Sequence, residues 1–173
     1  MTFSPRELVE LVEHGSTNQD VEQYMLDYFT QAQGGHFRHL RGSVLCSQAL
    51  RGWRGLLEQC FDAYKRQHYL VSIPALLSVI EGAVAENAGM LKTRRVNPKT
   101  IVLDLENSAP PGSMELLLWR STRIVLDALF ANSDFGGPHP GQLNRHWVLH
   151  GRDHTQWTQT DALRLFNLLA TIA

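Results

Sequence analysis

Residues 144–151 read Asn-Arg-His-Trp-Val-Leu-His-Gly and combine charged, imidazole and apolar side chains within about two helical turns. At about 100° per residue, a helix places His146 and His150 on one face with Arg145 beside them. The three apolar residues between the histidines then point elsewhere and are able to bury against neighbouring helices. The stretch therefore predicts a short helix with a polar edge on an apolar body, ended by Gly151.

Helical periodicity continues on both sides of this stretch. Downstream, residues 158–161 have the composition of a helix start, and the apolar residues after them recur on one side of a final helix. Upstream, Ser113 is expected to cap a helix that reaches Phe130, and a long core helix is predicted from Ser43 to Tyr64. Because no run of residues alternates convincingly as a strand does, the sequence predicts an all-α, up-and-down bundle of about five to seven helices.

Prolines mark the interruptions of the predicted bundle. Pro74 lies in an apolar run and fits best in the first turn of a new helix or at a kink, so a break is predicted near residues 68–73. The helix after it carries Glu81 in a strongly apolar segment, where a carboxylate needs a partner. Residues 91–112 hold three further prolines around a short apolar run that could form a strand, a packed loop or a short helix; a loop is favoured.

The N-terminal part has helical signals of its own. Ser4-Pro5-Arg6-Glu7 has the pattern of a capping box, and a short apolar stripe follows it. A second helix is predicted from Asn18 to the double glycine at residues 34 and 35. The chain is therefore divided into an N-terminal helical hairpin, residues 1–34, and a helical bundle, residues 35–173, which together form one compact unit.

The 173-residue chain has a globular composition, with 43% hydrophobic and 19% charged residues. Sixteen Lys and Arg against seventeen Asp and Glu create no overall positive field, so any RNA contact must be local. Cys46 and Cys60 lack Cys-x-x-Cys spacing and no secretory leader is recognised, which favours a reducing cytoplasm. No window approaches 18 uninterrupted apolar residues, so no membrane span is expected.

The histidines admit three chemical interpretations. A metal site is one, because His146, His150 and His154 step by four, but Gly151 is expected to end the helix before the third, and no metal is predicted. Acid–base chemistry is another, in which an imidazole moves a proton at a ribose 2′-hydroxyl while Arg145 neutralises charge on the attacked phosphate. The third is structural, with these side chains bracing the ends of the helix.

The pattern of Arg145, a polar residue, three apolar residues and His150 resembles the signature of HEPN domains, the higher eukaryotes and prokaryotes nucleotide-binding superfamily. The polar loop and apolar helix that follow are similar to the ending of many bacterial HEPN-like proteins. Residues 69–82, which include Ile-Pro-Ala-Leu-Leu and Ile-Glu-Gly, resemble a helix upstream in such proteins. The resemblance covers residues 43–173 and does not explain residues 1–34.

This resemblance implies an all-helical bundle that forms a symmetric homodimer, with the Arg and His of both copies lining one cleft. In many members this cleft cleaves RNA without a metal or other cofactor, and these members are often toxins or anti-phage effectors. Carried over to this chain, Arg145 binds and polarises the scissile phosphate, and His150 acts as general acid or base. His146, the polar residue after the arginine, orients the substrate or assists.

Three further residues are candidates for substrate binding or for support of the site. Asn144 directly precedes the motif. Glu81 either lies at the bundle edge, which is slightly favoured, or pairs with Arg145 and orients its guanidinium. Arg152 stands where some members carry a tyrosine two residues after the histidine, and this argues against regulation by modification of that tyrosine and against the antitoxin that performs it.

The leading hypothesis is a metal-independent endoribonuclease of a toxin or defence system, with an antitoxin or other defence protein as a possible partner. The alternatives are a non-catalytic HEPN-like module that binds RNA, nucleotide or protein, and a plain helical interaction domain.

Overall fold

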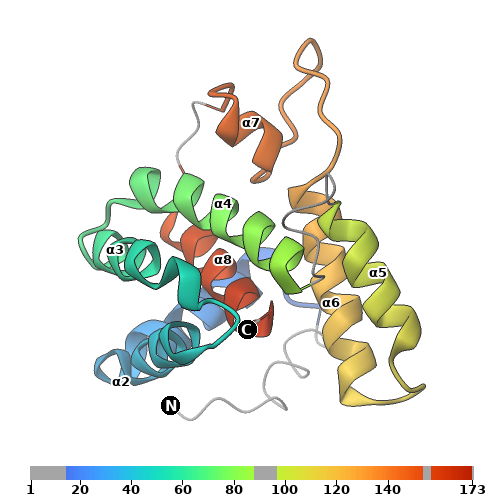
Figure 1. Ribbon diagram of the computed structural model, residues 1–173. Helices are drawn as coiled ribbons and strands as arrows, with labels where there is room; N and C mark the ends of the chain where they lie inside the picture. The colour runs from blue at the N-terminus through green and yellow to red at the C-terminus, as the bar shows by residue number, and fades with distance from the viewer. Residues whose placement is uncertain (1–14, 88–96, 154–156, 173) are drawn as a thin grey trace.

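The computed structural model describes residues 15–87, 97–153 and 157–172 (Figure 1). This part of the chain consists of helices and connections, without a strand, which confirms the predicted all-α bundle. In chain order the helices are α2 (Asn18–Cys46), the short 3-10 helix η1 (Arg51–Trp53), α3 (Arg54–Lys65), α4 (Tyr69–Asn87), α5 (Pro98–Ser108), α6 (Met114–Leu129), α7 (Arg145–Leu149) and α8 (Gln159–Ile172).

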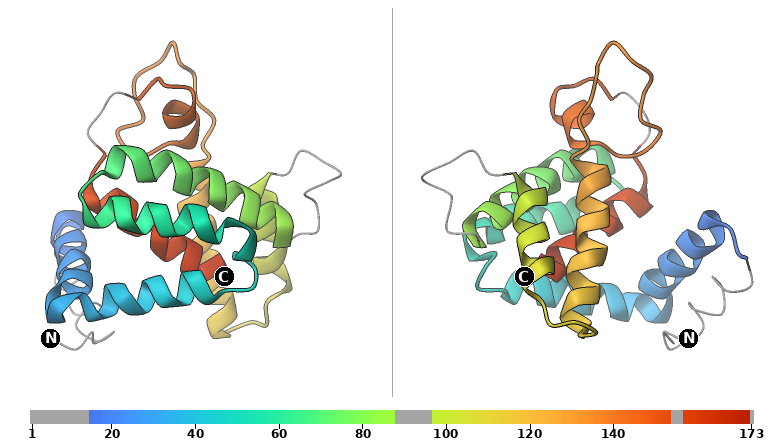
Figure 2. Two further views of the ribbon diagram at one scale, coloured as in Figure 1. Left: turned by 60° about the vertical axis from the view of Figure 1, so that its left-hand side comes forward. Right: turned by 90° about the vertical axis from the view of Figure 1, so that its right-hand side faces the viewer.

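Helix α4 lies on the side of the bundle that faces α7. It packs against α3 and α8, the α5–α6 hairpin lies at its C-terminal end, and α7 sits above it (Figures 1 and 2). Among the described residues, one segment, Tyr69–Glu86 of this helix, is long and apolar enough to cross a membrane by length and composition, and half of it is buried inside the bundle. Helix α4 therefore serves here as the core helix on which α7 rests.

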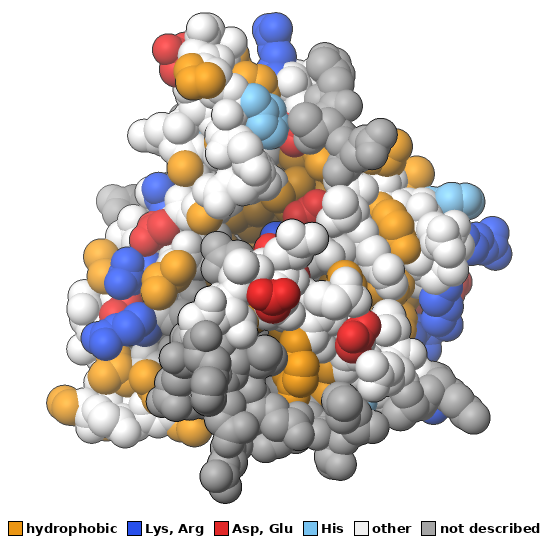
Figure 3. All heavy atoms as spheres, turned by 180° about the vertical axis from the view of Figure 1, so that it is seen from behind, with side chains coloured by type: hydrophobic (Ala, Val, Ile, Leu, Met, Phe, Trp, Pro, Cys, Tyr) orange, Lys and Arg blue, Asp and Glu red, His pale blue; other side chains and the backbone are white. Residues whose placement is uncertain are grey.

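Stacked aromatic rings join the second half of α2 to α3 and α8. Phe61 and Phe166 stack with ring centroids 4.0 Å apart, and Phe37 stacks on Tyr64 at 4.6 Å. The first half of α2 borders an apolar groove of about 370 Å³ with α6 and α8. Figure 3 shows apolar side chains distributed over the rear face of the molecule.

The predicted end of the second helix at the double glycine was wrong. Helix α2 continues through Gly34, whose φ of 69° is left-handed, and changes direction there (Figure 2). Phe37 and Leu40 beyond the bend are buried in the core, and this burial outweighs the weak helix propensity of the glycines. The division at residue 34 stays a prediction, and the capping box at residues 4–7 lies outside the described residues.

The predicted core helix from Ser43 to Tyr64 is interrupted, because α2 ends at Cys46 and α3 begins at Arg54. Trp53 at the end of η1 packs against α4, where a Cβ built on Gly82 lies only 2.7 Å from Cζ2 of the indole. The interruption thus brings Trp53 into contact with α4. The break predicted near residues 68–73 was wrong for residues 69–73, which belong to α4. The connection from α3 lies at residues 66–68, and Pro74 stands inside α4 rather than in its first turn.

The loop favoured within residues 91–112 was also wrong for residues 98–108, which form α5. Asn97 caps this helix, since its side-chain oxygen accepts a hydrogen bond from the Lys99 amide at 3.1 Å. Pro98 occupies the first turn, where a missing N–H costs no helical hydrogen bond. The helix prediction for residues 113–130 is confirmed, and Ser113 accepts the Leu116 amide at 3.1 Å as its cap.

Candidate functional site

Asn144 fixes the start of α7 and is 1% exposed. Its Oδ1 accepts hydrogen bonds from the backbone amides of His146 at 2.9 Å and Trp147 at 3.3 Å, and from the Ser133 hydroxyl at 3.0 Å. Its Nδ2 donates to the carbonyl of Ala131 at 3.0 Å. All of these bonds are internal, so Asn144 is a helix cap that ties α7 to the preceding loop rather than a group that faces a substrate.

Arg145 reaches down from α7 to Glu81 on α4. Its Nε and Nη2 donate to the same carboxylate oxygen, at 3.0 and 2.6 Å. The Arg145 side chain is 21% exposed and that of Glu81 is 37% exposed. Of the two roles predicted for Glu81, pairing with Arg145 therefore describes the geometry better than the role of an unpaired carboxylate at the bundle edge. Because Glu81 engages only Nε and Nη2, the two N–H groups of Nη1 are not used by this pair.

The two histidines of the motif lie on one side of α7, as their spacing predicts. Their rings are parallel within 4°, with centroids 6.2 Å apart. His150 is the C-cap, its amide donates to the His146 carbonyl at 3.1 Å, and its side chain is exposed. Gly151 follows with a φ of 64° and ends the helix, as expected. The short helix thus carries one guanidinium anchored on α4 and two parallel imidazoles.

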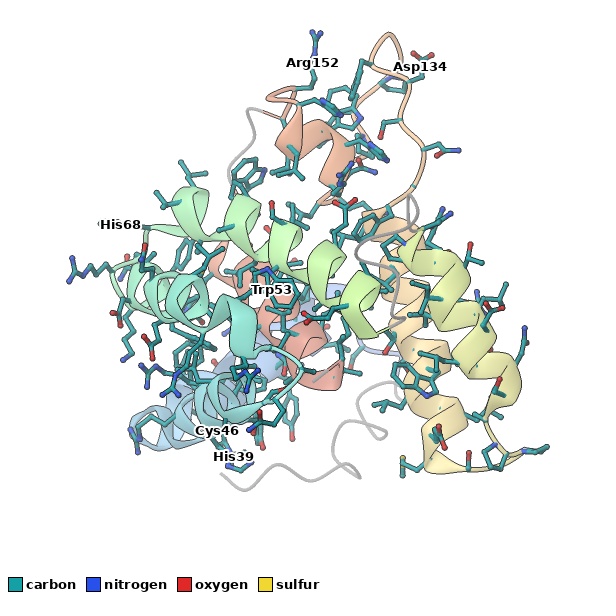
Figure 4. All side chains as sticks on the ribbon, in the orientation of Figure 1. His39, Cys46, Trp53, His68, Asp134 and Arg152 are labelled. Carbon is teal, nitrogen blue, oxygen red and sulfur yellow. The ribbon has the colours of Figure 1, made fainter. Side chains whose placement is uncertain are left out.

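Aromatic side chains surround the solvent side of α7. Phe135 from the preceding loop lies edge-on to Trp147 at 5.7 Å and to His150 at 5.6 Å. The guanidinium carbon of Arg152 is 5.6 Å from the Phe135 ring centroid. Figure 4 shows Arg152 at this end of the molecule, far from His68. Arg152 therefore lies beside the predicted catalytic His150 in space as well as in sequence.

His139 and the buried Asp153 hold the loops on either side of α7 together. The Nδ1 of His139 accepts a hydrogen bond from the Gly141 amide at 3.1 Å, and its Nε2 lies 3.4 Å from Oδ1 of Asp153. The Trp157 indole donates to Oδ2 of the same carboxylate at 2.9 Å. Both nitrogens of His139 face groups of the protein, so this pair is suited to positioning α7 rather than to proton transfer with a substrate.

The described residues contain no group of three or more His, Cys, Asp and Glu side chains arranged to hold a metal ion. His154, the third histidine of the metal interpretation, lies outside the described residues. Within the described part of α7 and its flanks, the chemistry available is that of Arg145, His146, His150 and Arg152.

No family model, curated protein or solved structure matches this chain. The function is therefore inferred from the chemistry of α7 and its surroundings.

The structure brings together Arg145 with Glu81, and His146 with His150, and it places Arg152 beside Phe135. It assigns Asn144 to the protein interior. Neither Phe135 nor His139 was predicted from the sequence. The loop between α6 and α7 carries both, and its lack of periodicity gave no sign that their rings pack on Trp147.

Proposed function

We propose that this protein is a metal-independent endoribonuclease of the HEPN type, in which Arg145 and His150 of α7 act on the RNA backbone. The observation that carries the proposal is the anchored guanidinium of Arg145 on the same short helix as two parallel imidazoles. A guanidinium binds phosphate oxygens through its planar N–H donors, and imidazole exchanges protons near neutral pH.

The chemistry follows from these two groups. His150 takes the proton from a ribose 2′-hydroxyl, whose oxygen attacks the adjacent phosphorus. The Nη1 side of Arg145, which the pair with Glu81 does not use, binds a phosphate oxygen and stabilises the negative charge that grows there. The bond from phosphorus to the 5′-oxygen breaks, and an imidazolium, His146 or a second His150, donates a proton to that oxygen. The products are a 2′,3′-cyclic phosphate and a 5′-hydroxyl.

A homodimer would serve this chemistry, because α7 lies at the outside of the bundle (Figure 1) and His150 is exposed there. Two copies facing each other across a twofold axis would form a cleft that excludes water and supplies both histidines. Light scattering tests the dimer.

We also propose that the protein acts in the cytoplasm as a toxin or defence protein, with an antitoxin or other defence protein as its partner. Induced expression in a bacterial host tests this role by measuring growth inhibition.

A non-catalytic module that binds RNA is the second candidate. The close ion pair with Glu81 favours it, because the carboxylate offsets the charge of Arg145 and engages two of its nitrogens. Such a module would hold a phosphate at Arg145 without moving a proton at His150. Cleavage assays separate the two candidates.

The test is RNA cleavage in EDTA by the wild type and by Arg145→Ala and His150→Ala. Loss of a general base, or of a group that stabilises the charge of the transition state, lowers the rate by about 10²-fold or more, so both variants should be nearly inactive with unchanged circular dichroism. His68→Ala is the matched control, because His68 is an exposed histidine at the turn before α4, away from α7 (Figure 4). Unchanged cleavage in both site variants would exclude the proposal, and activity that EDTA removes would point to a metal.

A further inference from the structure

The loop between α6 and α7 presents one aromatic ring to solvent. Phe135 is 41% exposed, and among the described residues it is the one aromatic side chain classed with the exposed large apolar groups. Asp134 holds the turn, since its carboxylate accepts the Gly136 amide at 2.9 Å and its carbonyl accepts the Gly137 amide at 3.1 Å. The exposed ring is therefore carried by a hydrogen-bonded turn.

The position of this ring is set by contacts with α7 and its C-terminal flank. Its edge-on contacts with Trp147 and His150 orient it, and the Arg152 guanidinium lies within cation–π range. Arg152 is itself exposed. The result is a partly exposed aromatic ring in contact with His150, with the Arg152 guanidinium over one of its faces.

We propose that Phe135 is a stacking platform for an unpaired nucleobase of single-stranded RNA, and that Arg152 binds the adjoining phosphate. Unstacked bases bind on aromatic faces and on guanidinium planes, whereas bases within a duplex offer no free face. The contact between Phe135 and His150 places the stacked nucleotide next to the group proposed to move the proton. The proposal rests on the proposed ribonuclease function for its substrate, but binding at the platform does not require cleavage.

Asp134 is the carboxylate closest in sequence, and its charge opposes RNA. It is engaged by the turn, and Figure 4 shows Asp134 and Arg152 projecting from this end of the molecule in different directions. The ring of Phe135 contacts the guanidinium of Arg152, the imidazole of His150 and the indole of Trp147. The surroundings of the platform are thus compatible with a phosphate.

The experiment measures binding of a fluorescein-labelled, 2′-O-methylated 12-nucleotide single strand by fluorescence anisotropy. This probe lacks the 2′-hydroxyl nucleophile, so the protein keeps all of its site residues during the assay. Stacking on an aromatic side chain corresponds to about 10-fold in affinity per base, so Phe135→Ala should weaken binding by about that factor. Phe135→Trp should retain wild-type affinity, and a blunt 12-base-pair duplex of the same sequence should bind more weakly than the single strand.

Leu103→Ala is the matched control, because Leu103 is 43% exposed on α5 and lies outside the α7 region (Figure 1). Thermal melts of each variant exclude unfolding. Equal affinity of Phe135→Ala and wild type, or no binding of the single strand by wild type, overturns the platform. RNA cleavage by the wild type is assayed in parallel to distinguish the two proposals. If binding depends on Phe135 but RNA is not cleaved, only the ribonuclease proposal is contradicted. If RNA is cleaved but binding does not depend on Phe135, only the stacking platform is contradicted.

Discussion

Glu81 controls the direction of Arg145, because two guanidinium nitrogens converge on one of its oxygens. Its negative charge also lowers the attraction of Arg145 for phosphate. We therefore expect Glu81→Ala to separate catalysis from binding. Cleavage should fall about 10- to 100-fold because the guanidinium loses its orientation, while affinity for the uncleavable 2′-O-methylated strand should stay the same or rise.

Glu86→Ala is the control for this prediction, since Glu86 is an exposed carboxylate on the same helix. Glu86→Ala should change neither the cleavage rate nor the affinity for the 2′-O-methylated strand. If Glu81→Ala loses both affinity and cleavage, then Glu81 serves only the folding of α7.

At the scale of single residues, the sequence was informative where a side chain acts within its own helix. The shared face of His146 and His150 and the end at Gly151 follow from helical geometry. The pairing of Arg145 with Glu81 joins residues 64 positions apart, and only the docking of α7 on α4 selects it. The burial of Asn144 could not be predicted either, because its position next to the motif in the sequence does not indicate whether its side chain is buried.

At the scale of elements, the approach of η1 to α4 depends on a glycine. A Cβ at position 82 would lie 2.7 Å from the Trp53 ring, so Gly82→Ala forces the indole or the helix to move. Overpacking of this kind costs about 1–3 kcal/mol, against a gain in helix propensity of about 1 kcal/mol. We expect a net loss of about 1 kcal/mol in the free energy of unfolding by urea denaturation.

Gly42→Ala in α2 is the matched control. Nothing lies within 4 Å of a Cβ at this position, so the substitution should stabilise the protein by up to about 1 kcal/mol. Stabilisation by both substitutions would contradict the close contact between Trp53 and Gly82.

The α5–α6 hairpin is joined by the carboxylate of Glu106, which is bonded by Arg120 at 3.0 Å and also by Arg123. The hydrogen bond from Arg123, followed by that from Arg120, lowers the pKa of Glu106 below its ordinary 4.5. A lowered folded-state pKa means that the ionised form favours folding, so this contribution is present above about pH 4.5 and is lost as the pH falls further.

Glu106→Gln should therefore lower the melting temperature at pH 7 and narrow the difference in melting temperature between pH 7 and pH 3.5, measured by calorimetry. Asp104→Asn, at an exposed carboxylate on the same helix, should leave that difference close to the wild-type value. An undiminished difference in Glu106→Gln would contradict the role of this ion-pair group.

Two helices that start with a Ser or Thr cap were predictable. Ser113 caps α6, and the hydroxyl oxygen of Thr158 accepts a hydrogen bond from the Asp161 amide at 3.3 Å at the start of α8. Helix α5 was missed because Pro98 was weighed as a breaker rather than as a first-turn residue. The path of α2 through Gly34 was missed for a different reason, since core contacts that are remote in sequence carry the helix across the bend.

At the scale of the whole molecule, the candidate site is built on α7, which packs on α4 (Figure 1). The loops on either side of α7 bring Phe135 and Arg152 together beside this helix (Figure 4). The all-α class followed from periodicity, whereas the placement of α7 on α4 depends on tertiary contacts. In the reaction that we propose, this assembled surface makes the ribose 2′-hydroxyl attack the adjacent phosphate.

Mass spectrometry of the ends of RNA cut by the wild-type protein in EDTA tests this claim most directly. The account predicts fragments with a 2′,3′-cyclic phosphate and a 5′-hydroxyl, and their absence with His150→Ala. Fragments with a 5′-phosphate and a 3′-hydroxyl, or RNA that stays intact with the wild type, would contradict it.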